Sequence, residues 1–527
     1  MGEQHVGDQR AGDRHNSAEW LVDRHLAEGR GDRVAVRCEG VDTTYAELQR
    51  ELFRAQHALV ELGVGPGDRV ALVLNDDLTF PSWYLGAQRS GVVPVPLSTM
   101  LTGPELGAIV ADSGAVAVVV SGTSSAAVEQ ITSSASAVAN VVIDGDPAGV
   151  TGRAGVALSA WSSFTDRTKM PVAETTVDSP AFWLYSSGTT GTPKGVMHVH
   201  GSPRATADTY AAEVLETTEH DRFLSVAKLF FAFGLGNSLT FPFAVGATSI
   251  LHPAPPTPRA FVDLVERERP TLFFASPGFC AALLDAAPAP EAFGSIRATV
   301  TAGESLPADI QRRFSALSGA PVLDGIGSTE LLHIFISNTL ASQWPGSSGV
   351  PVAGYVAELR DDDDHVVSEP DTPGYLYVRG PSAAVGYHGR ADATAAAFRD
   401  GWVRTGDVYV RSPEGVFTFL GRNSDMIKAG GIWVSPAEVE STLIEHPDVL
   451  EVAVVGARND DDLEEVVAFV VAAAGARPDT AALEQHCRDR MASFKRPRRI
   501  FVVDELPKTA TGKIRRFALR DALDRDG

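Results

Sequence analysis

Short β-branched runs alternate with helix-like segments along most of this 527-residue chain, and this alternation constrains the fold more than any other feature. The runs RVALVLND from Arg69, VAVVV from Val116 and VVIDG from Val141 are separated by segments with helical spacing. Farther along, TLFFASPGFCAALL, RATVTAGESLPADIQRRF and PVLDGIGSTE each pass from an apolar run into a Gly-rich turn and a predicted helix. Because alternating strands and helices pack as a helix-covered parallel sheet, the pattern predicts a layered α/β core with ligands at the strand ends.

The chain is long enough for two or more structural domains. Beyond Gly374, the short strands GYLYVRG and GVFTFLGR indicate a β-rich subdomain. After GRNSD, a helix, two strands, a second helix and a third strand predict a small α+β domain. The predicted fold class is therefore α/β, with a large N-terminal domain over residues 1–423 and a small mobile C-terminal lid over 424–527. The polar residues 1–17 are expected to be disordered.

Charge and composition narrow the classes of partner. Lysine and arginine number 45 against 67 acidic residues, a formal net charge of -22, which disfavours nucleic acid and anionic membrane. Cys38, Cys280 and Cys487 lie far apart, which indicates reduced thiols. No apolar run reaches the roughly 20 residues that span a bilayer, and the N-terminal segment is too polar for a signal peptide. We therefore expect a cytoplasmic protein.

The segment YSSGTTGTPKGVMHVH, from Tyr185 to His200, is suited to binding phosphate. Its lysine does not stand in the Walker register, which excludes a P-loop. Glycines nevertheless allow close approach of backbone N–H groups, and the hydroxyls and Lys194 supply donors and charge. On these features alone, a polar connection without a ligand is the alternative.

Five motifs in fixed order carry a family resemblance. SSGTTGTPKG, GSTE at Gly327, RTGD at Arg404, GRNSDMIKAGG at Gly421 and PKTATGK at Pro507 resemble the signatures of the acyl- and aryl-adenylate-forming enzymes. The resemblance extends over nearly the whole chain. It implies that the loop grips the triphosphate of ATP while a carboxylate attacks the α-phosphate, so that pyrophosphate leaves and an acyl-AMP forms.

The resemblance also implies an ATP- and AMP-binding set, which comprises Ser186, Ser187, Gly188, Thr189, Thr190, Lys194, Asp324, Gly325, Thr329, Asp407, Arg422, Lys428 and Lys513. Within it, Asp407 binds ribose, and Glu330 is the metal ligand for Mg²⁺, a cation that prefers carboxylate oxygen. Lys513 is the catalytic lysine between the carboxylate and the α-phosphate, and Thr329 and Glu330 complete the catalytic set. Taken singly, these residues also fit a helix start, a turn and a solvated tail charge.

Other positions concern the second half-reaction and depart in part from the family pattern. Gly430 and Gly431 match positions that line the channel for the pantetheine arm of CoA. Ser424 stands where relatives carry the Asp or Lys hinge of the rotating C-terminal domain. Ile326 replaces an aromatic residue beside adenine, and Phe233 replaces a tyrosine that many relatives carry, which removes one polar contact.

The predicted acid-binding pocket combines AKLFFAFGLGNSLTFPF with GIGSTELLHIF, segments that resemble those of benzoate-type aryl-CoA ligases. No Asp lies between Lys228 and Phe243 to pair with a substrate ammonium, which favours an uncharged tail. Small and aromatic residues together suit a flat ring. His333 is either a substrate hydrogen-bonding group or a core residue. The predicted pocket residues are Ala232, Phe233, Gly327, His333 and Ile334.

These features predict an AMP-forming acid-thiol ligase that converts an aromatic carboxylate, ATP and CoA to aryl-CoA through aryl-AMP, with Mg²⁺ as cofactor. Benzoate, a hydroxybenzoate and a larger acid such as a substituted naphthoate are the candidate substrates. The alternative is an adenylating enzyme that loads a carrier protein, and the remote one is a non-catalytic nucleotide-binding relative. A homodimer, and a catabolic or an antibiotic-biosynthetic pathway, are left open.

Overall fold

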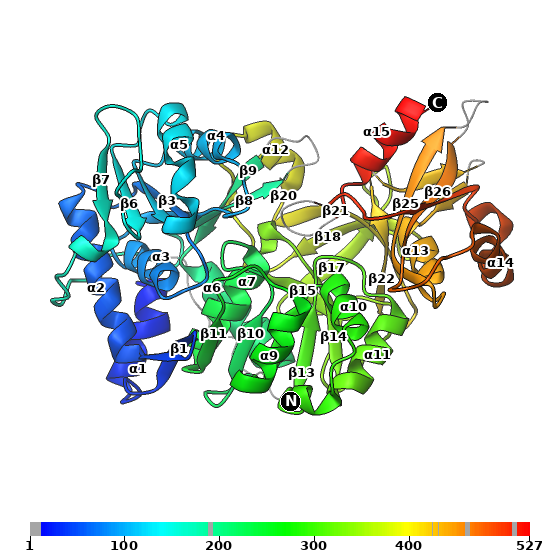
Figure 1. The fold of residues 1–527 in the computed structure, drawn as a ribbon, viewed down its shortest axis with the longest axis horizontal. Coiled ribbons are helices and arrows are strands. Elements are labelled where there is room, and N and C mark those ends of the chain that lie inside the picture. Colours follow the sequence, from blue (N-terminus) through cyan, green and yellow to red (C-terminus); the bar gives the residue numbers. More distant parts are fainter. Residues whose placement is uncertain are drawn as a thin grey trace.

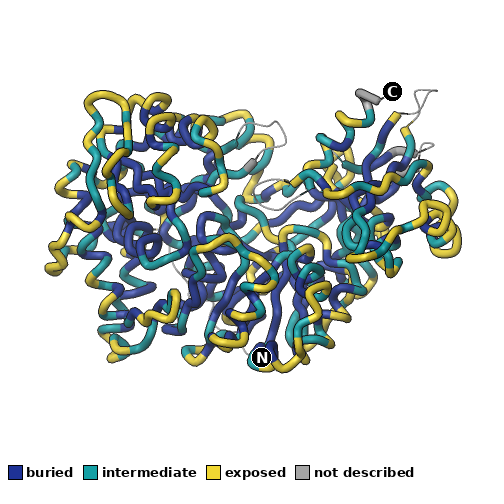
Figure 2. The backbone as a smooth tube through the Cα atoms, viewed as in Figure 1, coloured by how far each residue is buried: buried dark blue, intermediate teal, exposed yellow. Residues whose placement is uncertain are grey.

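A computed structural model describes the chain over residues 12–187, 193–423, 425–429, 432–458, 464–508 and 514–526. The predicted architecture is confirmed: helix-covered sheets form the larger part, and the elements after residue 425 gather at one side (Figure 1). Buried backbone is concentrated in the sheets, and exposed residues lie mostly at the periphery (Figure 2). Within the described residues, no helix is both long and apolar enough to cross a membrane.

The largest sheet has nine strands. They are Val34–Cys38 (β1), Val41–Thr44 (β2), Arg222–Ser225 (β10), Thr248–Leu251 (β11), Leu272–Ala275 (β12), Ala298–Thr301 (β13), Val322–Gly327 (β14), Ile334–Ser337 (β15) and Val350–Pro351 (β16). Their order is β16-β15-β14-β13-β12-β10-β11-β1-β2, with parallel pairing from β14 to β1. The central strands β12 and β13 are wholly buried, which is why they read as continuous apolar runs.

Helices cover this sheet on both sides. Those that pack with β10, β12 and β14 are Pro258–Glu268 (α9), Pro277–Asp285 (α10) and Ala308–Ser318 (α11). Over the other side lies Ala207–Val214 (η4), which continues from Gly201–Thr206 (α6). The amphipathic spacing of Phe261, Leu264 and Val265 explains the buried face of α9. The carboxyl ends of the parallel strands remain available for a site.

A second sheet of five parallel strands precedes the phosphate-loop segment. It consists of Arg69–Val73 (β3), Val93–Pro96 (β4), Ala117–Ser121 (β5), Asn140–Asp144 (β6) and Ala157–Ala160 (β7), in the order β4-β3-β5-β6-β7. Its helices are Tyr45–Glu61 (α2), Thr79–Arg89 (α3), Gly103–Ser113 (α4) and Val128–Ser134 (α5). A capping box is present at the start of α2, where Thr44 and Glu47 bond each other's backbone N–H.

Two antiparallel sheets follow in the chain. Gly386–Tyr387 (β19), Pro193–Val199 (β9) and Pro180–Ser187 (β8) form one. Val356–Arg360 (β17), Gly374–Arg379 (β18), Phe398–Arg399 (β20), Trp402–Arg411 (β21) and Phe417–Arg422 (β22) form the predicted β-rich part, with helix Ala391–Ala397 (α12) beside it. Both sheets bring motif residues to their ends.

The C-terminal unit has its own hydrophobic core. Its elements are Ile427–Ala429 (β23), Ile432–Val434 (β24), Pro436–Ile444 (α13), Val449–Arg458 (β25), Glu464–Ala472 (β26), Thr480–Arg490 (α14), Arg499–Val503 (β27) and Arg516–Asp526 (α15). β25 and β26 pair antiparallel, and β27 pairs parallel to β26. This is the small α+β arrangement that the sequence predicts.

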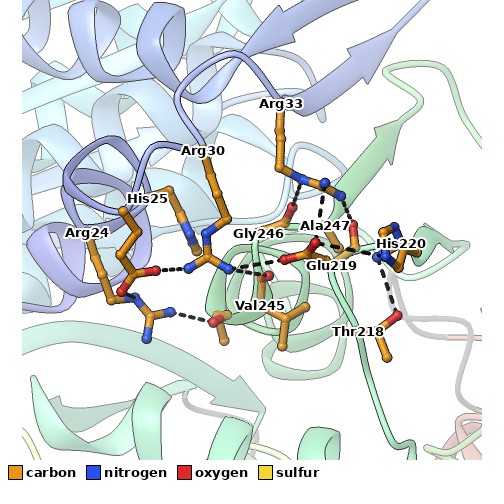
Figure 3. A network of polar contacts seen from close by, with 12 residues as sticks. Arg24, His25, Arg30, Arg33, Thr218, Glu219, His220, Val245, Gly246 and Ala247 are labelled. Carbon is orange, nitrogen blue, oxygen red and sulfur yellow. Dashed lines mark hydrogen bonds and ion pairs between the residues drawn. The ribbon is translucent and has the colours of Figure 1, made fainter.

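The N-terminal segment secures the helix that carries two predicted pocket residues. This helix runs through Ala232–Leu235 (α7), Gly236–Thr240 (η5) and Phe241–Val245 (α8). Near its C-terminus, Arg24, Arg30 and Arg33 donate to successive carbonyl oxygens (Figure 3). Arg30 Nη1 lies 3.4 Å from the oxygen of Val245, and Arg33 Nε lies 3.1 Å from that of Gly246. Cations at a helix C-terminus satisfy its orphan carbonyls and its dipole.

Residues 12–17 belong to the folded protein, so the prediction of a disordered extension through residue 17 is wrong for them. Asn16 and Ser17 are buried, and Asn16 Nδ2 donates to the Gln88 carbonyl oxygen at 2.9 Å. Ser17 N donates to His200 Nδ1 at 3.1 Å. These side chains are polar and their partners are distant in sequence, so no apolar periodicity marked them. Residues 1–11 lie outside the described residues.

Five buried histidines should make the fold sensitive to acid. Burial lowers the pKa of His15, His25 and His198 to about 4, and that of His200 and His333 to about 3. The unfolded chain protonates these rings near pH 6.5, whereas the folded chain does so only near pH 3 to 4. Stability is therefore lost as pH falls through this window.

Three buried carboxyls oppose this effect without cancelling it. Burial raises the pKa of Asp77 to about 6, of Asp76 to about 7 and of Asp324 to about 8, so each stabilises the fold more as pH falls from its folded pKa toward 4. With more histidines than carboxyls, we expect the thermal midpoint to be lower at pH 5 than at pH 7, as circular dichroism can measure. A higher midpoint at pH 5 would contradict this balance.

Candidate active site

The predicted phosphate loop joins the two strands of the β8–β9 hairpin. Across this hairpin Ser186 pairs with Lys194, and Ser187 pairs with Pro193. Regular pairing up to the last of these residues places both ends of the loop side by side. Gly188, Thr189 and Thr190 lie outside the described residues, so their predicted contacts with phosphate remain predictions.

A lysine, a tyrosine and a glutamate meet at this hairpin. The hydroxyl of Tyr387 donates to Glu330 Oε1 at 2.8 Å, and Lys194 Nζ lies 5.1 Å from the centroid of the Tyr387 ring. Tyr387 reaches this position because β19 pairs with β9, with Tyr387 opposite Val196. The structure thereby brings together Lys194 and Glu330, two predicted site residues that lie far apart in the chain. Tyr387, which no sequence motif indicated, contacts both of them.

Thr329 and Glu330 lie in a single 3₁₀ turn, Thr329–Leu331 (η7), directly after β14. The Ser328 side chain accepts a hydrogen bond from Leu331 N, and Leu332 has a φ of 65° that ends the turn. The chain then returns as β15, antiparallel to β14. The prediction of a helix after GSTE is therefore wrong: Leu332, with a φ of 65° and a ψ of -42°, is the centre of a γ-turn in which His333 N donates to the Leu331 carbonyl oxygen, and this turn reverses the chain. From β9, His198 Nε2 donates to the Thr329 carbonyl oxygen at 2.8 Å.

Asp407 and Arg422 face each other on adjacent strands. They are paired in register across β21 and β22, and Arg422 Nε lies 3.0 Å from Asp407 Oδ1. Asp407 is buried, whereas the Arg422 side chain is 45% exposed. Arg422 also donates to the Thr405 carbonyl oxygen at 3.0 Å, which fixes its orientation. A buried carboxylate held by one guanidinium is a suitable acceptor for sugar hydroxyls.

The other predicted nucleoside residues lie at the end of β14. Burial raises the pKa of Asp324 to about 8, and Thr301 Oγ1 donates to its Oδ1 at 2.8 Å. Burial also raises the pKa of Tyr409, and the charges of Asp407 and Asp324 both add to this shift. The Tyr409 hydroxyl lies 3.0 Å from Ser348 Oγ, and Asn338 Nδ2 donates to the carbonyl oxygens of Asp324 and Ser347, so the RTGD strand and β14 converge. Gly325 lies between Asp324 and Ile326 in β14.

The predicted acid pocket contains a group of packed rings. His333 has ring centroids of Phe241, Tyr210 and Phe233 at 4.5, 5.3 and 5.4 Å. Its Nε2 lies 3.0 Å from Asn237 Oδ1 and therefore donates to it. Because burial lowers its pKa to about 3, the ring is neutral at physiological pH. Ala232 and Phe233 are partly exposed, which leaves them able to face a ligand.

Two further predicted pocket residues, Gly327 and Ile334, lie where the backbones of β14 and the returning chain approach each other closely. A Cβ on Gly327 would lie 2.7 Å from the carbonyl oxygen of His333, so only glycine fits against this segment. Ile334 pairs with Gly327 and is 1% exposed, which places it in the wall behind the strand.

Several predicted residues of the C-terminal unit lie outside the described residues: Ser424, Gly430, Gly431 and Lys513. Lys428 lies in β23, but its side chain is not described. The segment that carries Lys513 is bracketed by an antiparallel bridge between Lys508 and Ile514. Next to it, Arg515 adds to the lowering of the Glu105 pKa, which is due mainly to hydrogen bonds from Thr102.

The sequence analysis did not identify several residues that contact the phosphate hairpin, which consists of β8, β9 and the loop between them, from neighbouring elements. Asp112, near the end of α4, accepts hydrogen bonds from Tyr185 at 2.8 Å and from Arg390 at 2.7 Å. His388 stacks on Trp183 with centroids 4.3 Å apart. No local pattern marks these residues, because each contact joins segments that are distant in the chain.

The donor set at Glu330 fits a Mg²⁺ ion that arrives with ATP. Within the described part of the chain, no group of three or more His, Cys, Asp or Glu residues could hold a metal by itself. One protein carboxylate combined with substrate phosphates and water is a common environment for Mg²⁺. Glu330 can supply that carboxylate beside the phosphate hairpin.

Comparison with known proteins agrees with this geometry. The family model for AMP-binding enzymes matches residues 23–388, and that for the AMP-binding enzyme C-terminal domain matches residues 438–513. The benzoate–CoA ligase of Thauera aromatica is 41% identical, over 97% of this chain and 96% of the relative. The 4-hydroxybenzoate–CoA/benzoate–CoA ligase of Rhodopseudomonas palustris is 39% identical, over 96% and 94%.

Solved structures show the same similarity. A benzoate CoA ligase from Burkholderia xenovorans LB400 has a TM-score of 0.88 and 41% identity, over 96% of this chain and 99% of that one. An anthranilate CoA ligase in complex with anthranoyl-AMP has a TM-score of 0.93 and 34% identity, over 99% and 100%. The resemblance inferred from the motifs and the predicted fold class are both confirmed. This chain belongs to the AMP-binding enzyme family.

Proposed function

We propose that this protein is an ATP-dependent aromatic carboxylate–CoA ligase. In the first half-reaction, a carboxylate oxygen attacks the α-phosphorus of ATP, the bond to the β-phosphate oxygen breaks, and aryl-AMP and pyrophosphate form. In the second, the thiol of CoA loses its proton and attacks the acyl carbon, and AMP leaves. The products are aryl-CoA, AMP and pyrophosphate.

The observation that carries this proposal is the convergence of Lys194 and Glu330 on Tyr387 beside the phosphate hairpin. Nucleotidyl transfer depends mainly on fixed charges that stabilise charge on phosphate oxygens, rather than on a protein nucleophile. A cation on the hairpin and a metal-binding carboxylate in the neighbouring turn η7 meet this need. The similarity to benzoate and hydroxybenzoate CoA ligases over the full length supports the choice of reaction.

We assign the nucleotide to a path along three segments. The hairpin hydroxyls and Lys194 hold the phosphates, Asp407 accepts from the ribose hydroxyls with Arg422 beside it, and Asp324 and Gly325 flank the base. When bound, Mg²⁺ neutralises charge on the phosphate oxygens, and Glu330 holds it. Lys513 stabilises the negative charge that develops between the carboxylate and the α-phosphate. In these assignments the hairpin binds the phosphates, η7 supplies the metal ligand and β21 binds the ribose.

We further propose that residues 424–527 act as a rotating lid, with residues 1–423 as the main domain. In this proposal, one lid orientation presents Lys513 for adenylation and the other presents Gly430 and Gly431 to the pantetheine arm of CoA. The separate hydrophobic core of this unit supports movement as one body. The hinge near Ser424 is part of the same proposal.

We propose an aromatic acid as the substrate because the pocket combines partly exposed Ala232 and Phe233 with the neutral ring of His333. No Asp lies between Lys228 and Phe243 to pair with an amino group at the substrate tail. An uncharged ring avoids the cost of leaving a charge unpaired there. The ATP and CoA cosubstrates are in keeping with a cytoplasmic location, which we also propose.

The proposal is tested by measuring pyrophosphate release with ATP and Mg²⁺ across benzoates, hydroxybenzoates, anthranilate, naphthoates, fatty acids and amino acids, with and without CoA. We expect release only with aryl acids, and aryl-CoA when CoA is present. Release without any CoA thioester would instead favour delivery to a carrier protein. The absence of pyrophosphate release with every acid of the panel would contradict the proposed activity.

A further inference from the structure

We propose that Tyr387 is a positioning residue for adenylation, which orients Glu330 through its hydroxyl and holds Lys194 against its ring. This inference rests on the proposed function. The Tyr387 side chain is 8% exposed, and its hydroxyl donates to Glu330 Oε1 at 2.8 Å. The Lys194 ammonium lies 5.1 Å from the centroid of the same ring. One buried side chain thus contacts both charged groups that we assign to the ATP phosphates.

The backbone around Tyr387 is bonded to the two segments that it connects. Ala384 N donates to the carbonyl oxygen of Glu330 at 2.8 Å, and His388 N donates to that of Gly195, next to Lys194, at 2.8 Å. The Tyr387 ring also packs edge-on against Phe398, with centroids 5.4 Å apart. The phenol therefore has little freedom to move, which is what a positioning group requires.

The chemistry of these contacts explains why a tyrosine suits this position. A hydrogen bond to one carboxylate oxygen restrains the Glu330 rotamer but leaves its charge in place. The ring face attracts the Lys194 ammonium without neutralising it, as a second carboxylate would. Tyr387 can therefore keep a cation and an anion close to each other while both remain available to phosphate and metal.

Tyr387→Phe tests this role, because it keeps the ring and removes only the hydroxyl. A hydrogen bond to a charged group contributes enough that we expect roughly tenfold slower aryl-AMP formation and a roughly tenfold higher half-saturating Mg²⁺ concentration. Conversion of supplied aryl-AMP and CoA to aryl-CoA should be unchanged, because that step involves neither the triphosphate nor its metal. A merely structural role would lower both half-reactions together.

Calorimetry provides a readout that does not depend on turnover. Without aryl acid, ATP should bind Tyr387→Phe about tenfold more weakly than wild type in the presence of Mg²⁺, and equally in EDTA. Tyr375→Phe is the matched control, since it also removes a phenol hydroxyl that donates to a carboxylate, here that of the exposed Asp362 at 2.6 Å, outside the proposed site. We expect the control to keep the wild-type Mg²⁺ dependence.

Two results separate this inference from the proposed function. If wild type releases pyrophosphate with an aryl acid but Tyr387→Phe shows wild-type Mg²⁺ dependence and ATP binding, the role of Tyr387 is overturned and the ligase activity stands. If the variant has a markedly lower thermal midpoint and loses both half-reactions, the residue is structural, and the inference also fails. A selective loss of Mg²⁺-dependent ATP binding in a variant with a wild-type midpoint supports it.

Discussion

Lys513→Ala is expected to lower the rate of aryl-AMP formation by more than about a hundredfold, the usual effect of removing one preorganised charge-stabilising donor. The lysine itself lies outside the described residues, but its segment is closed by the bridge between Lys508 and Ile514. Pyrophosphate release with saturating ATP, Mg²⁺ and aryl acid measures the effect.

The same variant should convert supplied aryl-AMP and CoA to aryl-CoA at a rate within about twofold of wild type, because no bond to ATP breaks in that step. Lys508→Ala is the matched control. Lys508 Nζ lies 2.7 Å from Glu451 Oε1 on the surface, and an exposed pair of this kind contributes little. An equal loss of both half-reactions in Lys513→Ala, or an equal effect of the control, would show that Lys513 does not act in adenylation.

Gly234→Ala is expected to reduce kcat/KM for the aryl acid about a hundredfold, because Gly234 lies in α7 directly against the preceding turn, where there is no room for a side chain. A Cβ on Gly234 would lie 2.0 Å from the carbonyl oxygen of Lys228 and 2.5 Å from that of Ala227. Both atoms belong to the backbone, so α7 and the turn must move apart by more than an ordinary side-chain adjustment. Ala232 and Phe233 lie in α7 and therefore move as well. Steady-state kinetics with the best acid of the panel measures this loss.

The expected shift should also cost roughly 1–3 kcal/mol of unfolding free energy, as overpacking does. Gly278→Ala is the control, since its Cβ would meet only Glu304 Oε2, at an ordinary 3.5 Å. We expect wild-type kinetics and stability for Gly278→Ala. Wild-type affinity for the aryl acid in Gly234→Ala would rule out the proposed link between this turn and the pocket.

Most secondary structure could be predicted from local pattern. β-branched runs predicted β3, β5 and β6, and the apolar runs that lead into Gly-rich turns predicted β12, β13 and β14. Local pattern failed after GSTE, where a helix was expected and a γ-turn at Leu332 reverses the chain into β15. It also failed at residues 12–17, whose polar side chains are buried by partners such as Gln88 and His200.

The candidate site could be predicted only in part, and for a physical reason. Motif residues such as Lys194, Glu330 and Asp407 are recognisable because phosphate, metal and ribose each require particular charges and donors. Tyr387 and Asp112 were missed because their roles depend on what they contact, and a tyrosine or an aspartate carries no such information in its local sequence. His333 was left open until its Asn237 partner and surrounding rings were known.

By itself, the sequence determined the layered α/β class, the anionic surface and the family, because periodicity, charge and ordered motifs are properties of the chain alone. The tertiary structure decided which of these residues meet. Lys194 and Glu330 converge on Tyr387, and Asn338 and Ser348 connect β14 with Tyr409 of the RTGD strand. Such contacts depend on strand order and on the direction of each loop, which no local stretch of sequence specifies.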